Sequence, residues 1–315
     1  MSIPMPPREL RRIVGPTEPE AFDNPRGEPL FAPAGLPPDA YDVVFDFGCG
    51  CGRLARQLLQ QKPRPRRYVG VDAHRGMVEW CQQNLSPVDP AFQFFHHNVY
   101  SPSYAPENSL RLAEPFPVEV GEVSLFIGLS VFTHLCRPQT EYYLGELERV
   151  LRPRGVAFTT WFFFDRDSFP FFPEGPFSLY RSEECFDQAV IYDRRWFLDT
   201  VRRAGLGVRS GTHQGLAGHQ WAVVLEKRTP ETVDRFPLGE EGAEWICGAT
   251  RKPMATPTLP PERIEKAKGA PIDTDQGVSA RPREPAGRPQ PPALFGALAE
   301  LEALRRRVSG SPGGG

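Results

Sequence analysis

Short apolar runs alternate with segments of helical periodicity through much of the chain. The first run, Val43–Phe47, is apolar at every position but one, which is typical of a strand buried on both faces of a parallel sheet. Leu54, Leu58 and Leu59 follow at helical spacing, and Pro63 ends that pattern. The order of strand, turn and helix predicts the first half of a βαβ unit. Comparable apolar runs cover residues 68–71, 92–95, 123–127 and 156–164.

The later part of the chain predicts two more helices and a closing pair of strands. Leu144, Leu147 and Leu151 fall on one helical face, and the turn at residues 152–155 is expected to end that helix. Asp193 stands where it can cap the N-terminus of the second helix. The segments LGVRS and HQWAVVLEKR then predict a final antiparallel pair.

A glycine-rich turn joins the first strand to its helix. Asp46 is followed by Gly48, Gly50 and Gly52, each separated by one residue. Glycines are needed at such a turn because a side chain keeps the backbone from approaching a ligand. A dinucleotide fingerprint requires its third glycine at position 53, where this chain has Arg53, so NAD or FAD is a poor match.

The second strand ends in an acid at the position where nucleotide-binding folds place a ribose ligand. Asp72 lies 20 residues beyond Gly52 and follows the apolar run at 68–71. The alternative is that Asp72 caps the next helix, which carries Met77 and Cys81 on one face. The position and the residue type both favour the ribose role.

Several histidines and acids are candidates for proton transfer. An imidazole titrates near neutral pH, so His134 could act as a general base, although packing within its own segment is the preferred interpretation. His96 and His97 are adjacent and lack a partner at metal-ligand spacing, so no metal site is expected. The candidate catalytic residues are His134, Asp165, His213 and His219.

Composition limits the class of protein. The chain has 315 residues and a formal net charge of −2, which argues against a dedicated nucleic-acid binder. Its six cysteines are irregularly spaced and no signal peptide is evident, so we expect reduced thiols and a cytoplasmic location. No apolar run approaches 18 residues, so no membrane span is expected.

Four segments resemble, in order and spacing, the class I S-adenosylmethionine-dependent methyltransferases of bacterial type. They are D-F-G-C-G-C-G-R, V-G-V-D, S-V-F-T-H-L and R-V-L-R-P-R-G, the last with Arg154 in place of a more usual glycine. The resemblance implies an α/β, Rossmann-like fold with a seven-stranded, mostly parallel sheet, an antiparallel last strand and helices on both faces. It also implies S-adenosyl-L-methionine as cofactor and methyl transfer to a small-molecule or saccharide-type acceptor. The alternative is a non-catalytic binding or scaffold protein that keeps the fold.

By this resemblance the methionine part of the cofactor lies on Asp46 and the loop 48–52, the ribose on Asp72, and the adenine on Asn98 and Val99. The full set of implied cofactor residues is Asp46, Gly48, Cys49, Gly50, Gly52, Arg53, Asp72, Ala73, Asn98, Val99, Leu129 and Ser130. Methyl transfer from a sulfonium needs alignment and exclusion of water, and it needs no metal.

The expected organisation has four parts. Residues 1–40 form a lead-in that either packs on the sheet edge or roofs the active site, and residues 41–227 form the methyltransferase domain. Residues 228–292 are a proline-rich linker, expected to be disordered. Residues 293–308 form a short amphipathic helix that docks on a partner or on the domain. Within the domain, the insertion 165–192 is expected to be an irregular lid or substrate wall.

Overall fold

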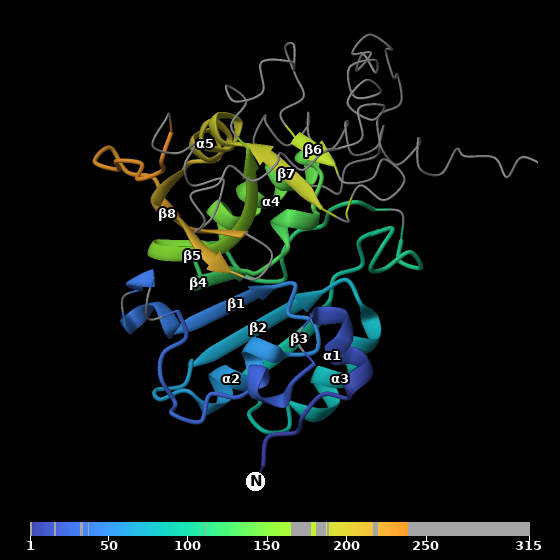
Figure 1. The fold of residues 1–315 in the computed structure, drawn as a ribbon. Helices are drawn as coiled ribbons and strands as arrows, with labels where there is room; N and C mark the ends of the chain where they lie inside the picture. The colour runs from blue at the N-terminus through green and yellow to red at the C-terminus, as the bar shows by residue number, and fades with distance from the viewer. Residues whose placement is uncertain are drawn as a thin grey trace, which may run out of the picture.

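The fold is built around one mixed sheet, seen in a computed structural model (Figure 1). The structure describes residues 2–15, 17–31, 34–36, 38–109, 111–164, 178–180, 187, 189–216 and 220–238. The expected linker beyond 238, the terminal helix at 293–308 and most of the insertion at 165–192 lie outside the described residues.

Seven strands have the order β3-β2-β1-β4-β5-β9-β8. The first five pair in parallel, whereas β9 pairs antiparallel with both β5 and β8. Only β9 is therefore reversed, and the predicted seven-stranded sheet with one antiparallel member is confirmed. The strands are β1 (Val43–Phe47), β2 (Arg67–Asp72), β3 (Phe92–His96), β4 (Val123–Gly128), β5 (Leu151–Phe164), β8 (Leu206–Leu216) and β9 (Gln220–Lys227).

Two further strands, β6 (Ser178–Tyr180) and β7 (Val190–Asp193), lie in the insertion that was expected to be irregular. That expectation was wrong for these residues. The long strand β5 pairs with β9 as far as Trp161, and its last three residues, Phe162–Phe164, pair in parallel with β7. The V-I-Y run of β7 supplies the β-branched and aromatic residues that strands favour, and its Val190 and Tyr192 are buried between β5 and β6.

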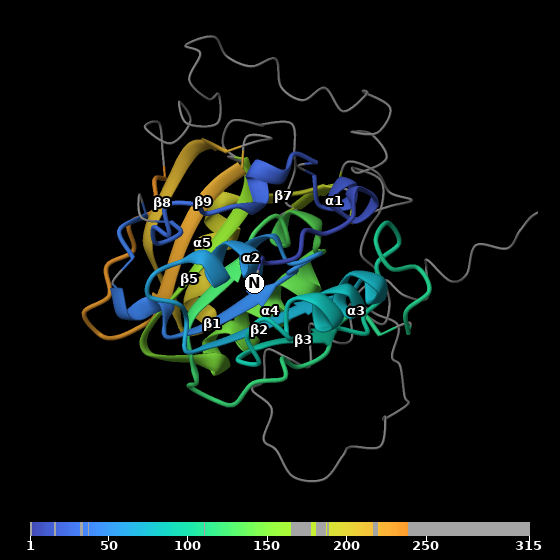
Figure 2. The ribbon, with the colours of Figure 1, turned by 90° about the horizontal axis from the view of Figure 1, so that it is seen from below.

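Helices cover both faces of the sheet (Figure 2). Alternate residues of each strand enter different cores: Val44 packs with α2 and α3, whereas Phe45 packs with α4 and α5. The helices are α1 (Arg8–Val14), α2 (Arg53–Gln60), α3 (Arg75–Asn84), α4 (Arg137–Val150) and α5 (Arg194–Arg203). Asp193 caps α5 as predicted, by accepting from the Trp196 N–H at 2.8 Å. Helix α4 ends at Val150, so the turn at 152–155 belongs to β5 and the predicted helix end was too late.

The N-terminal segment is fastened to α2 by one buried arginine. Arg56 is 9% exposed and donates to the carbonyls of Ile3, Pro4 and Phe22 at 3.2, 3.1 and 3.0 Å. These contacts lie on both sides of α1 in sequence. The lead-in is thus attached to the domain, and α1 spans the interval between two fixed points.

The domain also extends past its predicted boundary at Lys227. The Asp234 carboxylate accepts from the Val208 N–H at 2.8 Å and from the Arg202 guanidinium at 2.9 Å. Phe236 is 9% exposed and belongs to the core on the α4 and α5 side. Residues 228–238 therefore pack on β8 and α5 and are not part of a linker.

Replacement of Phe236 by alanine tests this docking. We expect Phe236→Ala to lower the free energy of unfolding by about 3 kcal/mol, because a buried aromatic side chain is lost and a cavity remains. Val233, which is 76% exposed in the same segment, is the matched control, and Val233→Ala should change stability by less than about 0.5 kcal/mol. Equal effects in urea denaturation would show that the segment does not dock.

Candidate functional site

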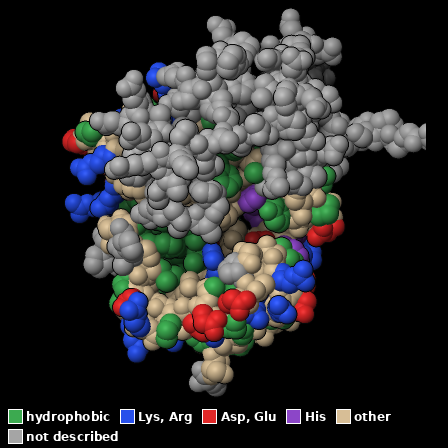
Figure 3. All heavy atoms as spheres, viewed as in Figure 1, with side chains coloured by type: hydrophobic (Ala, Val, Ile, Leu, Met, Phe, Trp, Pro, Cys, Tyr) green, Lys and Arg blue, Asp and Glu red, His purple; other side chains and the backbone are tan. Residues whose placement is uncertain are grey.

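A cavity of about 390 Å³ opens at the carboxyl ends of β1, β2 and β4. This volume lies within the range of roughly 300–1,000 Å³ typical of small-molecule sites. Figure 3 shows a hollow near the middle of this face, bordered by hydrophobic, acidic and histidine side chains. Open α/β sheets bind their ligands at this edge, so the cavity is the candidate active site.

The glycine loop forms one wall of the cavity. The N–H groups of Gly48 and Cys49 both donate to the carbonyl of Val71, at 2.8 and 3.0 Å, which holds the loop against the end of β2. Gly48 and Gly50 line the cavity and have φ values of 79° and 54°. A Cβ on Gly50 would lie 2.5 Å from Cγ1 of Val14, so a side chain there displaces its neighbour.

Gly52 is required for a different reason. It does not line the cavity, and a Cβ on it would lie 2.5 Å from Cδ1 of Leu85 and 3.0 Å from Sγ of Cys81. Its φ of 80° is left-handed, directly before the first residue of α2. Gly52 thus permits close packing of α2 on α3 and does not contact the space where a ligand binds.

Asp72 lies at the cavity and fastens the loop. Its Oδ2 accepts from the Gly50 N–H at 2.7 Å and its Oδ1 accepts from the His74 N–H at 2.8 Å. Burial raises the pKa of this carboxyl. The N-cap of α3 is His74, whose Nδ1 accepts from the Met77 N–H, so the alternative interpretation of Asp72 as the cap is wrong.

Asp46 and Arg53 give the same wall two opposite charges. Both residues line the cavity, and Asp46 is 2% exposed. Burial raises the pKa of Asp46 to about 7, although the Tyr68 hydroxyl donates to its Oδ2 at 2.6 Å. Burial lowers the pKa of the Arg53 guanidinium, which remains a cation at neutral pH. This wall can therefore bind a cationic group and an anionic group side by side.

The ends of β2 and β3 form the next part of the wall. Ala73 and Val99 line the cavity, but Asn98 does not, and its side-chain oxygen accepts from the Ser109 N–H at 3.1 Å. Asn108 connects the two strand ends, because its amide donates to the carbonyls of Ala73 and Val99 at 2.8 and 3.0 Å. Sequence reasoning missed Asn108, which lies in a proline-interrupted loop without periodic signal.

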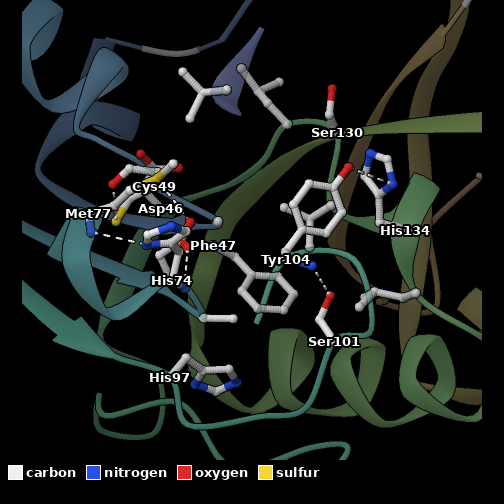
Figure 4. A pocket seen from close by; sticks show the side chains of 18 of the residues that line it. Asp46, Phe47, Cys49, His74, Met77, His97, Ser101, Tyr104, Ser130 and His134 are labelled. Carbon is white, nitrogen blue, oxygen red and sulfur yellow. Dashed lines mark hydrogen bonds between the residues drawn. The ribbon is translucent and has the colours of Figure 1, made fainter. Parts of the chain in front are cut away.

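The opposite wall comes from the residues after β4. Leu129 and Ser130 line it, and Ser130, with a left-handed φ of 55°, donates its N–H to Thr160 Oγ1 at 2.7 Å. Strained backbone of this kind is found at functional sites. Figure 4 shows Asp46, Cys49 and His74 on one side of the cavity and Tyr104, Ser130 and His134 on the other.

Of the four candidate catalytic residues, His134 is brought to the cavity. Asp165 and His219 lie outside the described residues, as does the side chain of His213. The cavity also receives residues that the sequence did not single out for it: His74, Met77, His97, Tyr104, Gln139, Tyr143 and Asp187. They come from five separate segments, and only the fold brings them together.

His97 is the least expected of these. It is 3% exposed, its Nε2 lies 2.7 Å from the Tyr143 hydroxyl, and its Nδ1 lies 3.3 Å from Glu114 Oε1. Burial lowers the pKa of His97 to about 3, so the ring is neutral. It was expected to be an ordinary surface or supporting histidine; it is not at the surface, and it lines the cavity.

Two further surveys concern only the described part of the chain. No group of three or more His, Cys, Asp or Glu side chains there is arranged to hold a metal ion. None of its helices combines the length and apolar character that crossing a bilayer requires.

The strand order and the position of the cavity define a Rossmann-like α/β fold with a candidate ligand site at the carboxyl ends of its parallel strands. Residues 44–155 match the family model of a methyltransferase domain, and this segment includes β1 to β4, the glycine loop and α4. Over these residues the chain is therefore similar to a methyltransferase domain, in agreement with the family predicted from the sequence.

Solved structures similar to this chain include three methyltransferases. One is a TehB-like S-adenosylmethionine-dependent enzyme of Corynebacterium glutamicum, with 17% identity, 62% of this chain and 85% of the other covered, and a TM-score of 0.38. The 1,6-didemethyltoxoflavin-N1-methyltransferase of Burkholderia thailandensis has 16% identity, coverages of 64% and 75%, and a TM-score of 0.43. An enzyme of Aquifex aeolicus has 16% identity, coverages of 70% and 98%, and a TM-score of 0.42.

The buried carboxyl of Asp46 gives a testable dependence of stability on pH. Its pKa is about 7 in the folded state against an ordinary 3.8, so the folded protein binds more protons and this group's contribution falls as pH rises from about 4 to 7. Asp46→Asn removes the effect. We expect the gain in unfolding free energy of the variant over the wild type to be roughly 2–3 kcal/mol larger at pH 8 than at pH 5. Urea denaturation at the two pH values measures it, and a pH-independent difference would refute the raised pKa.

Proposed function

We propose that this protein transfers a methyl group from S-adenosyl-L-methionine to a small-molecule or saccharide-type acceptor by in-line displacement. The observation that carries the proposal is the charge pattern on the glycine-loop wall, where Asp46, Arg53 and Asp72 line one cavity. An amino acid joined to a ribose presents an ammonium, a carboxylate and hydroxyls, and these three side chains complement them.

The residues divide by the part of the donor that they would hold. Asp46 would hold the ammonium and Arg53 the carboxylate, while Gly48, Cys49 and Gly50 would leave room for close approach of the methionine portion. When bound, the donor supplies a methyl group on a positively charged sulfur.

The ribose and adenine complete the assignment. Asp72, Ala73 and Val99 line the cavity; Asp72 would accept from the ribose hydroxyls, and Ala73 and Val99 would hold the adenine. Asn98 is retained as the adenine partner, which requires that its side chain turn away from the Ser109 N–H that it now accepts from. Leu129 and Ser130 border the methionine portion from the opposite wall.

The protein's part in the reaction is alignment and exclusion of water. Ile13, Val14 and Gly15 line the cavity from the N-terminal segment, which supports a role for this segment as a roof over the site. The fixed walls hold the acceptor atom in line with the transferred group, and the apolar side chains of Ile13 and Val14 reduce access of solvent.

Gly50→Ala tests the glycine loop. The added Cβ lies 2.5 Å from Val14 Cγ1, so the wall must shift and affinity for S-adenosylhomocysteine should fall about tenfold or more. Gly145 in α4 is the matched control, because nothing lies within 4 Å of a Cβ there. Gly145→Ala should leave affinity unchanged in calorimetric titration. If folded wild-type protein shows no binding, the methyltransferase proposal fails.

Asp72→Ala tests the ribose assignment separately. The variant loses a charged acceptor for the ribose and the bond that fixes the Gly50 N–H, so we expect affinity for S-adenosylhomocysteine to fall by about 10- to 100-fold. Titration with adenosine alone should show a loss of the same order, because adenosine carries the ribose but lacks the amino acid. Unchanged adenosine affinity would contradict the role of Asp72.

A further inference from the structure

A side chain from a loop outside the cavity joins the ends of β2 and β3. The main-chain bonds between these strands continue to His97, whose N–H donates to the Asp72 carbonyl at 2.9 Å. Beyond this bond, the Asn108 amide donates to the carbonyls of Ala73 and Val99 at 2.8 and 3.0 Å. We propose that Asn108 is a positioning residue for the methyl donor, whose amide sets the separation of the two chain segments that hold the adenosine part. This inference rests on the proposed function and deepens it by naming a residue that acts on the donor through others.

The orientation of the Asn108 amide is fixed by its partners. Its nitrogen has two hydrogens, and each is directed to one carbonyl oxygen. Its Oδ1 lies 3.2 Å from Nε2 of His96, and that nitrogen also lies 3.1 Å from the Ala73 carbonyl oxygen. Both neighbours of Nε2 are oxygens that accept, so Nε2 carries the hydrogen. A reversed amide would place Oδ1 against two carbonyl oxygens. Asn108 is 8% exposed, and a buried amide with satisfied groups is a rigid spacer.

The loop that carries Asn108 is itself fastened to the chain after β3. The Asn108 N–H donates to the Ala105 carbonyl at 3.3 Å, and Ala105 pairs with Ser101 in a short antiparallel bridge. On the other side, the Ser109 hydroxyl donates to the Asn98 carbonyl at 2.7 Å. Bonds before and after Asn108 therefore hold its backbone in place without any ligand.

The two carbonyls that Asn108 holds belong to residues of the proposed adenosine site. Ala73 and Val99 line the cavity, whereas Asn108 does not. Ala73 directly follows Asp72, so a fixed Ala73 carbonyl also restricts the peptide next to the acid assigned to the ribose. An adenine ring gains from apolar neighbours only when their separation matches its thickness, because a small gap already loses much of the dispersion energy. Asn108 can thus set donor affinity without touching the donor.

A purely structural role for Asn108 makes a different prediction. Loss of the amide bonds would then lower the free energy of unfolding and leave the ligand affinity of the folded protein unchanged. A positioning role lowers the affinity of the folded protein, and it does so equally for every ligand that carries adenosine. Titration with S-adenosylhomocysteine and with adenosine, which lacks the amino acid, separates the two roles.

Asn108→Asp is the test variant, because a carboxylate keeps the shape of the amide and can still accept from His96. An ionised carboxylate cannot donate, so both bonds to the carbonyls are lost. We expect affinity for S-adenosylhomocysteine to fall about 10- to 50-fold in calorimetric titration, and affinity for adenosine to fall by the same factor. At saturating adenosine, nuclear Overhauser contacts between the adenine protons and the Val99 methyl groups should be present in wild type and weaker in the variant.

Asn84→Asp is the matched control. The Asn84 amide donates to the Trp80 carbonyl at 2.8 Å at the end of α3, and Asn84 lies outside the cavity lining. Its affinity for both ligands should stay within about twofold of wild type. Asn108→Ala removes the amide without adding a charge, and it should lose affinity as Asn108→Asp does. Urea denaturation of each variant shows that the titrated protein is folded.

Three outcomes would overturn the role of Asn108. The first is unchanged affinity of the folded Asn108 variants for adenosine. The second is a loss for S-adenosylhomocysteine with none for adenosine, which would place the effect at the amino-acid end. The third is the absence of contacts between bound adenosine and Val99 in the wild type. Failure of wild-type protein to bind S-adenosylhomocysteine would instead refute the proposed function, so the two failures are distinguished.

Discussion

The site depends on one hydrogen bond, from the Gly50 N–H to the carboxylate of Asp72. A glycine-rich loop has a high conformational entropy, and it becomes a defined surface only when its backbone donors are fixed. Two further bonds from Gly48 and Cys49 to the Val71 carbonyl hold the other end of the loop. Val71 and Asp72 lie at the end of β2, so the parallel pairing of β1 with β2 sets the geometry of the cavity wall that the glycine loop forms.

The same arrangement has an electrostatic cost. Asp46 is buried and Asp72 is half-buried, and each has a raised pKa, with desolvation as the main cause and the charge of Asp72 a further cause for Asp46. A folded protein gains nothing from ionised carboxyls that are poorly solvated. Such residues fit a site that receives a positively charged ligand, where the lost solvation is offset on binding. The two raised pKa values lower the stability of the folded protein at neutral pH, and this loss of stability serves ligand binding.

The sequence predicted the parts of the site that are local. The three glycines and Asp72 were found because each directly follows a buried strand, and parallel strands end at the same edge. The seven-stranded sheet followed from the order of the motifs. The sequence could not separate the roles of the glycines in the loop. Gly50 lines the cavity and lies against Val14, whereas Gly52 lies against Cys81 and Leu85, and these contacts are tertiary.

What the sequence missed depends on tertiary contacts. Asn98 was chosen for its position after β3, yet Asn108 holds the strand ends, and no periodic pattern distinguishes the two amides. His134 was expected to pack within its own segment, because its partner Asp187 lies in an insertion without regular spacing. The strand β7 was not predicted, because it also lies in this insertion. It pairs with the last three residues of the long strand β5.

The N-terminal segment shows why the boundary of a domain and the boundary of its site differ. Helix α1 has no buried residue and is too short to be stable alone. It is placed over the glycine loop because Arg56, on the helix that the loop begins, binds the chain on both sides of it. The glycine loop, helix α2 and the N-terminal segment therefore pack together and depend on the contacts of Arg56. Arg56 itself does not line the cavity. A substitution that removes its hydrogen bonds to the N-terminal segment would nevertheless change the cavity, because that segment places Val14 against the glycine loop.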